Sequence, residues 1–259
     1  MTEGAQSYAR PLEGPVGFRE TDASPLSASQ QDYIRRIASV HAHRRGELIF
    51  GEGDAGQFVF FVESGVIRIS RCAENGHRQI LAFRVPGDLF GVPEAGSYLN
   101  SAEAASEARI YRLSWQRMQQ FMREEPQLLS DLLTKILHNF RQAQSRLMTL
   151  GQQNTYQRLA SVLLDFSRVP EFFDREQSFL NLPISRFDVA DYLAAPRQST
   201  TRAFAKLESQ GLIRRISSRT IEILDVEGLE LMQSGPRRND SPDQSRWRPR
   251  LDSNQRPTD

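Results

Sequence analysis

Apolar residues recur with a period of 3.5 residues between Pro126 and Leu150, separated by alternating steps of four and three. The positions between them carry charged and amide side chains that suit water. Such a seam lies on one face of a helix and is typical of helices that pair with another helix. Pro126 suits the first helical position and Gly151 suits the end of the helix. The seam consists of Leu129, Leu133, Ile136, Phe140, Ala143, Leu147 and Leu150.

The regularity of this seam favours a partner helix over a long core helix within one domain. Leu128 and Leu132 widen the apolar stripe on one flank, so we expect the helix to pack on its own domain as well. The same helix of a second chain is the simplest partner, because two-fold dimers are the commonest assembly. The pattern therefore predicts a homodimer.

The period changes to two between residues 46 and 113, ahead of the seam. Short β-branched and aromatic runs alternate there with glycine-containing turns, which indicates a sandwich or a small barrel. Asn75 and Gly76 predict a hairpin turn. Two helices are predicted around these strands, over residues 29–40 with Ser29 as a cap and over residues 115–123 leading into the seam.

Behind the seam, the pattern predicts helices, a short strand at 179–183 and a hairpin. Asn154 suits the cap of the first helix, and residues 167–177 form a predicted loop. Ser185 and Asp188 have the spacing of a capping box that opens a further helix. After a short break at 194–196, a second helix begins and ends before Gly211. Two helices with a tight break and a following hairpin predict a winged helix-turn-helix.

Basic and amide side chains crowd the first turns of the second helix of this motif. Arginine can fork onto guanine and glutamine can pair with adenine, so this face suits the major groove better than a merely solvated charged face. The net charge of +1 hides this local basic region. We expect base reading by Arg197, Gln198, Thr201 and Arg202, and phosphate contacts by Ser199, Lys206, Arg214 and Arg215.

Composition limits the classes of protein to consider. At 259 residues, with 39% hydrophobic and 25% charged residues, the chain suits two globular domains. Cys72 is the single cysteine, so no intrachain disulfide can form and a reducing compartment is expected. The sequence has no pattern of a signal peptide or a membrane span, so we expect a cytoplasmic protein.

The order of these modules resembles the Crp/Fnr family of bacterial transcription regulators. The stretches GELIFGEGDAGQFVFFVESGVIRIS and PGDLFG match its β-roll, and FDVADYL and RQSTTRAFAKLESQGLI match its helix-turn-helix. With NSAEA after PGDLFG, the chain looks most like the FixK-type branch. The resemblance implies an α+β fold. Its expected parts are a cyclic-nucleotide-binding-type β-roll (a double-stranded β-helix) at 29–125, a dimerisation helix at 126–151 and a winged helix-turn-helix domain at 152–232. The Gly-, Pro- and Ser-rich start and the Arg-, Pro-, Asp- and Ser-rich end predict a disordered arm at 1–28 and a disordered tail at 233–259.

The resemblance also implies function. It predicts a sequence-specific transcription regulator, an activator, that binds a palindromic DNA operator as a homodimer and contacts RNA polymerase. The base-reading positions of the family fall on Gln198, Thr201 and Arg202, with Arg197 beside them. The first of these is often Glu in the family, so Gln198 is a departure, and Pro196 stands where Ser or Thr usually caps the recognition helix.

No cofactor is expected. Val92 and Asn100–Ser101 stand where relatives that bind cyclic AMP carry Glu and an Arg-Ser or Arg-Thr pair. The oxygen-sensing branch holds an iron–sulfur cluster with four cysteines, whereas this chain has one. Cys72 and His77 flank the predicted hairpin turn, and neither they nor His41 and His43, expected in a loop, have the spacing of a haem or metal site. Redox control through Cys72 stays open.

Two alternatives remain from the sequence. The β-roll could sense an effector or redox change and act mainly through protein partners, if the last domain had lost DNA binding. An enzyme is the weaker alternative, because the strands lack the histidine motif of metal-dependent cupins and no nucleophile–base pair is recognisable. We therefore expect no enzymatic activity.

Overall fold

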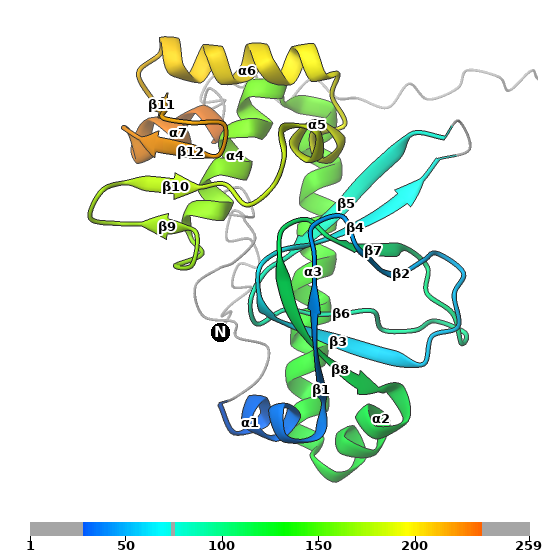
Figure 1. The fold of residues 1–259 in the computed structure, drawn as a ribbon. Helices are drawn as coiled ribbons and strands as arrows, with labels where there is room; N and C mark the ends of the chain where they lie inside the picture. Colours follow the sequence, from blue (N-terminus) through cyan, green and yellow to red (C-terminus); the bar gives the residue numbers. More distant parts are fainter. Residues whose placement is uncertain (1–27, 74–75, 235–259) are drawn as a thin grey trace, which may run out of the picture.

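A computed structural model describes residues 28–73 and 76–234. Two sheets form the N-terminal part, a long helix follows, and a small helical domain with a third sheet ends the described chain (Figure 1). Most of the predicted arm and tail, residues 1–27 and 235–259, lies outside the described residues. The N-terminal elements are α1 (Ala28–Ile37), β1 (Ser39–His43), β2 (Leu48–Phe50), β3 (Phe58–Ser64), β4 (Ile67–Cys72), β5 (Arg78–Arg84), β6 (Leu89–Phe90), β7 (Ser101–Ala104), β8 (Ala108–Ser114) and α2 (Trp115–Glu124).

The two N-terminal sheets are antiparallel, with strand orders β1-β8-β3-β6 and β2-β7-β4-β5. They confirm the predicted β-roll. Strands β4 and β5 form the predicted hairpin, in which Gly76 has a φ of 76°. Asn75, the other residue of the predicted turn, lies outside the described residues.

Aromatic rings fill the interior of the β-roll. The ring centroids of Phe50 and Tyr98 are 3.9 Å apart, and those of Phe60 and Phe90 are 5.2 Å apart. Gly91 ends the PGDLFG motif with a φ of +71°, and a Cβ there would lie 2.7 Å from the Phe60 ring. The glycine is therefore required both by its backbone conformation and by the packing of these rings.

The N-terminal helix is shorter than predicted. It ends at Ile37, and residues 39–43 form β1, which pairs with β8. Ser29 lies inside α1, so its predicted role as the cap is wrong. The expected loop around His41 and His43 is also wrong, because both residues lie in β1. The open edge of β8 offers this polar segment a partner, and such long-range pairing overrides local propensity.

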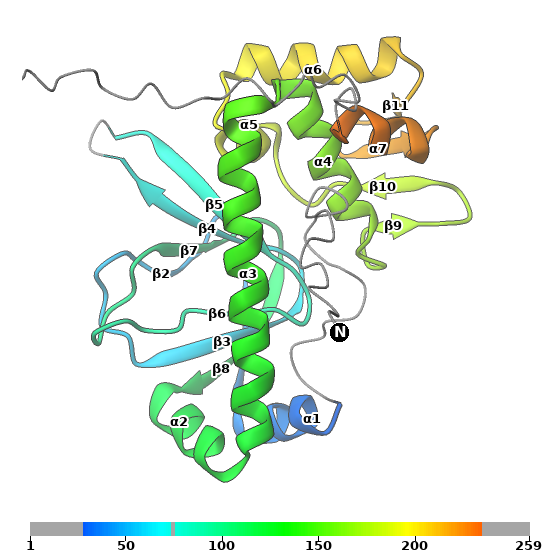
Figure 2. The same cartoon turned by 180° about the vertical axis from the view of Figure 1, so that it is seen from behind.

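The predicted seam helix is α3 (Pro126–Gln152), which runs along one side of the β-roll and lies in front of it in Figure 2. It continues through Gly151 and ends one residue later. Leu128 and Leu132 are buried with Met118 and Phe121 of α2, which confirms that one flank of the helix packs on its own domain. The described apolar side chains on the opposite face, Leu129 and Leu133 among them, are exposed.

The C-terminal domain shares its core with the β-roll. Phe83 of the β-roll lies 5.8 Å from Phe166 and 4.9 Å from Tyr192, measured between ring centroids. A short strand lies in the predicted loop at 167–177, where it pairs with β10. The elements of this domain are α4 (Thr155–Ser167), β9 (Phe173–Asp174), β10 (Phe179–Asn181), α5 (Arg186–Leu193), α6 (Arg197–Ser209), β11 (Ile213–Arg215), β12 (Thr220–Ile223) and α7 (Val226–Ser234).

Candidate nucleic-acid interface

Helix α5 begins at the predicted capping box. The Asp188 backbone N–H donates to Ser185 Oγ at 3.0 Å, and the Ser185 backbone N–H donates to Asp188 Oδ2 at 3.1 Å. The Ser185 hydroxyl also donates to Oδ2 at 2.6 Å. Two backbone groups that the helix itself cannot satisfy are thereby paired, which fixes the start of α5.

A tight turn at residues 194–196 links α5 to α6. Ala194 takes a left-handed conformation with a φ of 48°, which ends α5. Helix α6 begins directly after Pro196, which provides no side-chain cap. The Thr200 hydroxyl donates to the Pro196 carbonyl at 3.3 Å, which does not replace a cap for the N–H groups of the first turn. The two-helix arrangement predicted from the sequence is therefore present, with a strained residue in its turn.

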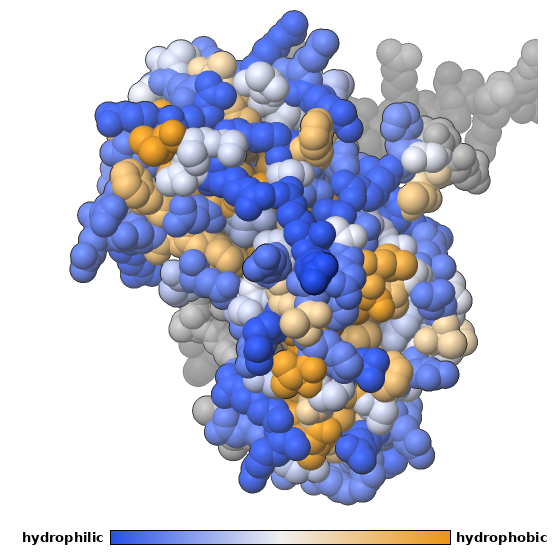
Figure 3. All heavy atoms as spheres, in the orientation of Figure 1, coloured by the Kyte–Doolittle hydropathy of each residue, from blue (hydrophilic) through white to orange (hydrophobic). Residues whose placement is uncertain are grey.

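Helix α6 buries one face and exposes the other. Thr200, Ala203, Phe204 and Leu207 are buried in the core of the domain. The predicted base-reading residues share the exposed face, and Lys206 is exposed further along the helix, whereas Ser199 is only half-exposed. Figure 3 shows mainly hydrophilic residues over this end of the molecule. The exposed base-reading residues are Arg197, Gln198, Thr201 and Arg202.

Two arginines of the hairpin pair with acids inside the domain. Arg214 Nη1 lies 3.2 Å from Glu222 Oε2, and the Arg215 guanidinium contacts the Glu208 carboxylate. The hydrogen bond from Arg215 lowers the pKa of Glu208. The charge that Arg214 and Arg215 offer to a polyanion is therefore partly neutralised. Among the described residues, no carboxylate pairs with Arg202 or Lys206.

Arg186 lies between the two helices of the motif. Its guanidinium carbon is 3.4 Å from the centroid of the Phe204 ring, and its Nη1 is buried without a hydrogen-bond partner among the described residues. Burial, with the nearby charge of Arg215, lowers the pKa of Arg186 to about 10. The side chain is thus part of the packing between α5 and α6 and does not extend from the exposed face.

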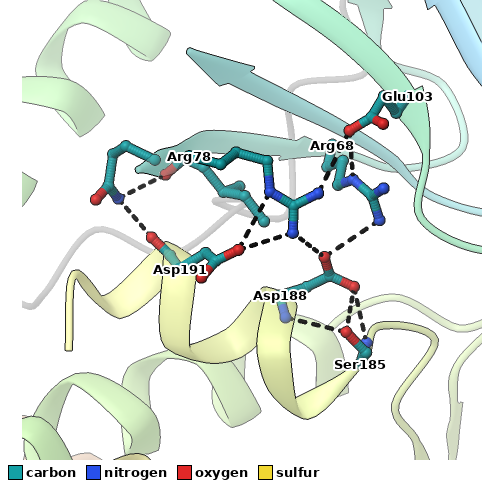
Figure 4. A network of polar contacts seen from close by, with 8 residues as sticks. Arg68, Arg78, Glu103, Ser185, Asp188 and Asp191 are labelled. Atoms are coloured by element: carbon teal, nitrogen blue, oxygen red, sulfur yellow. Dashed lines mark hydrogen bonds and ion pairs between the residues drawn. The ribbon is translucent and has the colours of Figure 1, made fainter. Parts of the chain in front are cut away.

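A cluster of ion pairs, which the sequence analysis missed, joins α5 to the β-roll (Figure 4). Asp188 Oδ1 accepts from Arg68 Nη1 at 3.2 Å and from Arg78 Nη2 at 3.1 Å. Arg78 also donates to Asp191 at 2.7 Å, and Arg68 donates to Glu103 at 2.9 Å. These carboxylates, above all Asp191, raise the pKa of Arg78 against the opposing effect of burial.

The same boundary carries two further polar contacts. The Gly65 backbone N–H donates to Glu171 Oε1 at 3.1 Å, and Gln79 Nε2 donates to the Asp191 carbonyl at 2.6 Å. The Gln79 contact and the shared apolar core around Phe83 fix α5 on the β4–β5 hairpin, and the Gly65 contact joins the turn between β3 and β4 to the segment after α4. The position of α6 relative to α3 therefore depends on the β-roll.

The outward face of α3 carries the first part of the predicted seam. Leu129, Leu133, Ile136 and Phe140 are between 54% and 59% exposed, and Ala143 is also exposed. Leu137, outside the predicted seam, adds to this face at 50% exposure. The side chains of Leu147 and Leu150 lie outside those described. Large apolar side chains exposed at heptad spacing indicate a helix that lacks its partner.

The remaining candidates from the sequence lie on the β-roll. Cys72 is exposed at the end of β4. It stands opposite Arg78 in the β4–β5 hairpin, so it is not the residue opposite His77. The His43 ring is hydrogen-bonded to Glu47 at 2.9 Å. In the part of the chain that the structure describes, no group of three or more His, Cys, Asp or Glu residues could hold a metal ion. None of the described helices is long and apolar enough to cross a membrane.

Two family models match the chain in the order of these domains. A cyclic nucleotide-binding domain matches residues 40–125, which cover most of the β-roll. A Crp-like helix-turn-helix domain matches residues 157–232, which include α5, α6 and the hairpin.

Known proteins resemble the chain over most of its length. The nitrogen fixation regulation protein FixK of Azorhizobium caulinodans is 31% identical over 233 residues, 89% of this chain and 94% of that protein. The transcriptional activator protein FnrA of Stutzerimonas stutzeri is 26% identical over 216 residues, 82% of this chain and 88% of that protein. The structure of FixK2 from Bradyrhizobium japonicum has a TM-score of 0.69 and 27% identity, covering 74% of this chain and 96% of that one. The chain therefore belongs to the Crp/Fnr family and is a DNA-binding transcription regulator of the FixK type.

Proposed function

We propose that the protein is a homodimeric transcription activator that binds a palindromic operator through helix α6 of each subunit. The observation that carries this proposal is the exposed basic and amide face of α6, held on the same body as the exposed apolar face of α3. The first face suits base edges in the major groove, and the second suits a second copy of the same helix.

The energetics of α3 support pairing. Leu129, Leu133, Ile136 and Phe140 are each about half covered already. Full burial of such a side chain contributes about 1.5–3 kcal/mol, so each would gain about 1 kcal/mol in a dimer. Several such gains on both chains are of the size needed to offset the entropy lost on association. The two α3 helices would then set the distance between the two α6 helices.

The roles of individual residues in DNA binding follow from exposure and chemistry. Arg197, Gln198, Thr201 and Arg202 are the proposed base readers, with Arg202 as the guanine-reading arginine. Ser199 and Lys206 are proposed to contact phosphate, and Arg214 and Arg215 to do so after exchanging their carboxylate partners. In a dimer the two α6 helices would enter successive major grooves about 34 Å apart.

An activator must also reach the transcription machinery, so we propose RNA polymerase as the protein partner. The relatives named as activators support this proposal. The role proposed for the β-roll is to hold α5, since its contacts with α5 include Arg68 and Arg78. Val92 and Asn100–Ser101, which lack the Glu and the Arg with which relatives hold cyclic AMP, support a β-roll that works without this ligand.

The direct test begins with selection of an operator from random duplex DNA by the wild-type protein. Gel shifts then compare wild type, Arg202→Ala and a control, Arg175→Ala, which removes the same charge from an exposed position in the β9–β10 loop. We expect Arg202→Ala to weaken binding to the selected operator by about 1–3 kcal/mol, and Arg175→Ala to have little effect. Equal affinity of wild type for the selected and a scrambled sequence would contradict the proposal.

A further inference from the structure

Phe187 is exposed where its helix otherwise buries its apolar residues. It is 53% exposed at the second position of α5, whereas Val189, Ala190, Tyr192 and Leu193 of the same helix are buried. The capping box explains why the helix starts here but not why a phenylalanine faces solvent. A single exposed apolar residue is common on protein surfaces, so it needs a second observation before it carries a function.

The second observation is the partner of the ring. The guanidinium carbon of Arg197 lies 4.0 Å from the centroid of Phe187, within the range of a cation–π contact. Arg197 is the first residue of α6 and is exposed. The contact therefore connects the start of the first helix of the motif to the start of the second.

The position of Arg197 at the start of α6 is electrostatically unfavourable when the helix is considered alone. The N-terminus of a helix carries a partial positive charge, so a cation there is unfavourable. Pro196 provides no side-chain cap that would offset the unpaired N–H groups. The face of an aromatic ring attracts a cation, so Phe187 compensates for this placement and holds the guanidinium on the side of α5.

Stacking leaves the guanidinium able to read a base. An arginine that stacks through its flat face keeps its N–H groups at the edge, where they can fork onto guanine O6 and N7. Arg186 differs, because its guanidinium is packed against Phe204 and half-buried between the helices. Arg197 also contacts a phenylalanine ring, but it lies on the exposed side of the motif, where its N–H groups are accessible.

We propose that Phe187 is a positioning residue for DNA recognition, whose ring holds the Arg197 guanidinium in the orientation that reads one guanine of each half-site. The proposal rests on the proposed function, because it requires α6 to enter the major groove. Fixing a flexible side chain before binding removes part of the entropy that recognition costs. The contribution of Phe187 should therefore appear only through Arg197.

The test measures base preference at every position of the operator selected by wild type. Competition binding is carried out with Arg197→Ala, Phe187→Leu, Phe187→Tyr and the double variant Phe187→Leu/Arg197→Ala. Leucine keeps apolar bulk without an aromatic face, and tyrosine keeps the face. Thermal unfolding of each variant shows whether the domain remains folded.

We expect Arg197→Ala to abolish the preference for guanine at one base pair of each half-site. Phe187→Leu should reduce the preference at the same base pair about two- to fivefold, and Phe187→Tyr should retain it. The double variant should match Arg197→Ala, because effects that pass through one side chain are not additive.

Three results would overturn this inference. Phe187→Leu could keep the full preference, it could lose preference at a different base pair, or it could weaken binding by the same factor in the Arg197→Ala background. The last two would mean that the ring contacts DNA itself. These results would leave the proposed function intact. Failure of wild type to select any sequence would instead contradict the proposed function, and this inference with it.

Discussion

Asp188 connects the DNA-binding domain to the β-roll, and its loss should destabilise the whole chain. The residue is 1% exposed, and its two oxygens serve different partners. Oδ2 belongs to the capping box with Ser185, and Oδ1 accepts from Arg68 and Arg78 across the domain boundary. Asp188→Asn keeps the shape of the side chain but removes the charge that faces the two guanidinium groups.

The size of the expected loss in stability depends on the carboxylate partners that remain for Arg68 and Arg78 in Asp188→Asn. Removing one partner of a buried ion pair costs about 3–5 kcal/mol, because a charge is left uncompensated. Here Arg68 keeps Glu103, and Arg78 keeps Glu103 and Asp191. We therefore expect the low end, a loss of about 3 kcal/mol in the free energy of unfolding. Ser185→Ala, which removes only the hydroxyl of the cap, should cost about 1 kcal/mol.

Urea denaturation followed by circular dichroism measures both variants. The decisive comparison is a double-mutant cycle of Asp188→Asn with Arg78→Met, in which we expect a coupling energy of about 1 kcal/mol or more. If the two effects simply add, or if Asp188→Asn costs no more than Ser185→Ala, the ion-pair cluster does not hold the domains together.

Three further changes have expected outcomes. Ala194→Gly should raise the free energy of unfolding by about 0.5–1 kcal/mol, because glycine takes the left-handed conformation without strain, and an unchanged urea midpoint would contradict this. Arg215→Ala removes one proposed phosphate contact, so the plot of log K against log salt from fluorescence anisotropy should become shallower by about 1, whereas an unchanged slope would exclude Arg215 from the interface. Because Arg215 lowers the pKa of Glu208 below 4.5, the pair stabilises the native state above that value and is lost as the pH falls through the lowered pKa. The free energies of unfolding of wild type and Glu208→Gln, measured across this pH range, should thus converge in acid. A difference that stays constant with pH would contradict this linkage.

Local signals predicted most of the elements. The capping box at Ser185, the helix that carries the seam and the turn before α6 each depend on residues close in sequence, and all three are present. The error at residues 39–43 has a different origin. That segment alternates polar and apolar residues over only five positions, which is a short signal, and it becomes a strand because β8 offers an unpaired edge.

The contacts around the candidate interface were harder to predict. Asp188 is a correct capping residue, but its second role depends on Arg68 and Arg78, which lie 120 and 110 residues away. Phe187 and Arg197 are separated by a helix and a turn, and only the geometry between α5 and α6 brings the ring under the guanidinium. Sequence patterns report what a residue does within its own element, whereas these roles arise between elements.

The number of chains bound to a palindromic operator tests the central claim, that paired α3 helices place two α6 helices on one DNA site. Sedimentation of wild type and Ile136→Asp with the selected operator measures it directly, since a carboxylate in the apolar seam opposes pairing. We predict two wild-type chains per palindrome, and for Ile136→Asp a monomer that binds each half-site weakly and independently. A wild-type monomer that binds the palindrome as tightly as it binds a half-site, unaffected by Ile136→Asp, would contradict the claim.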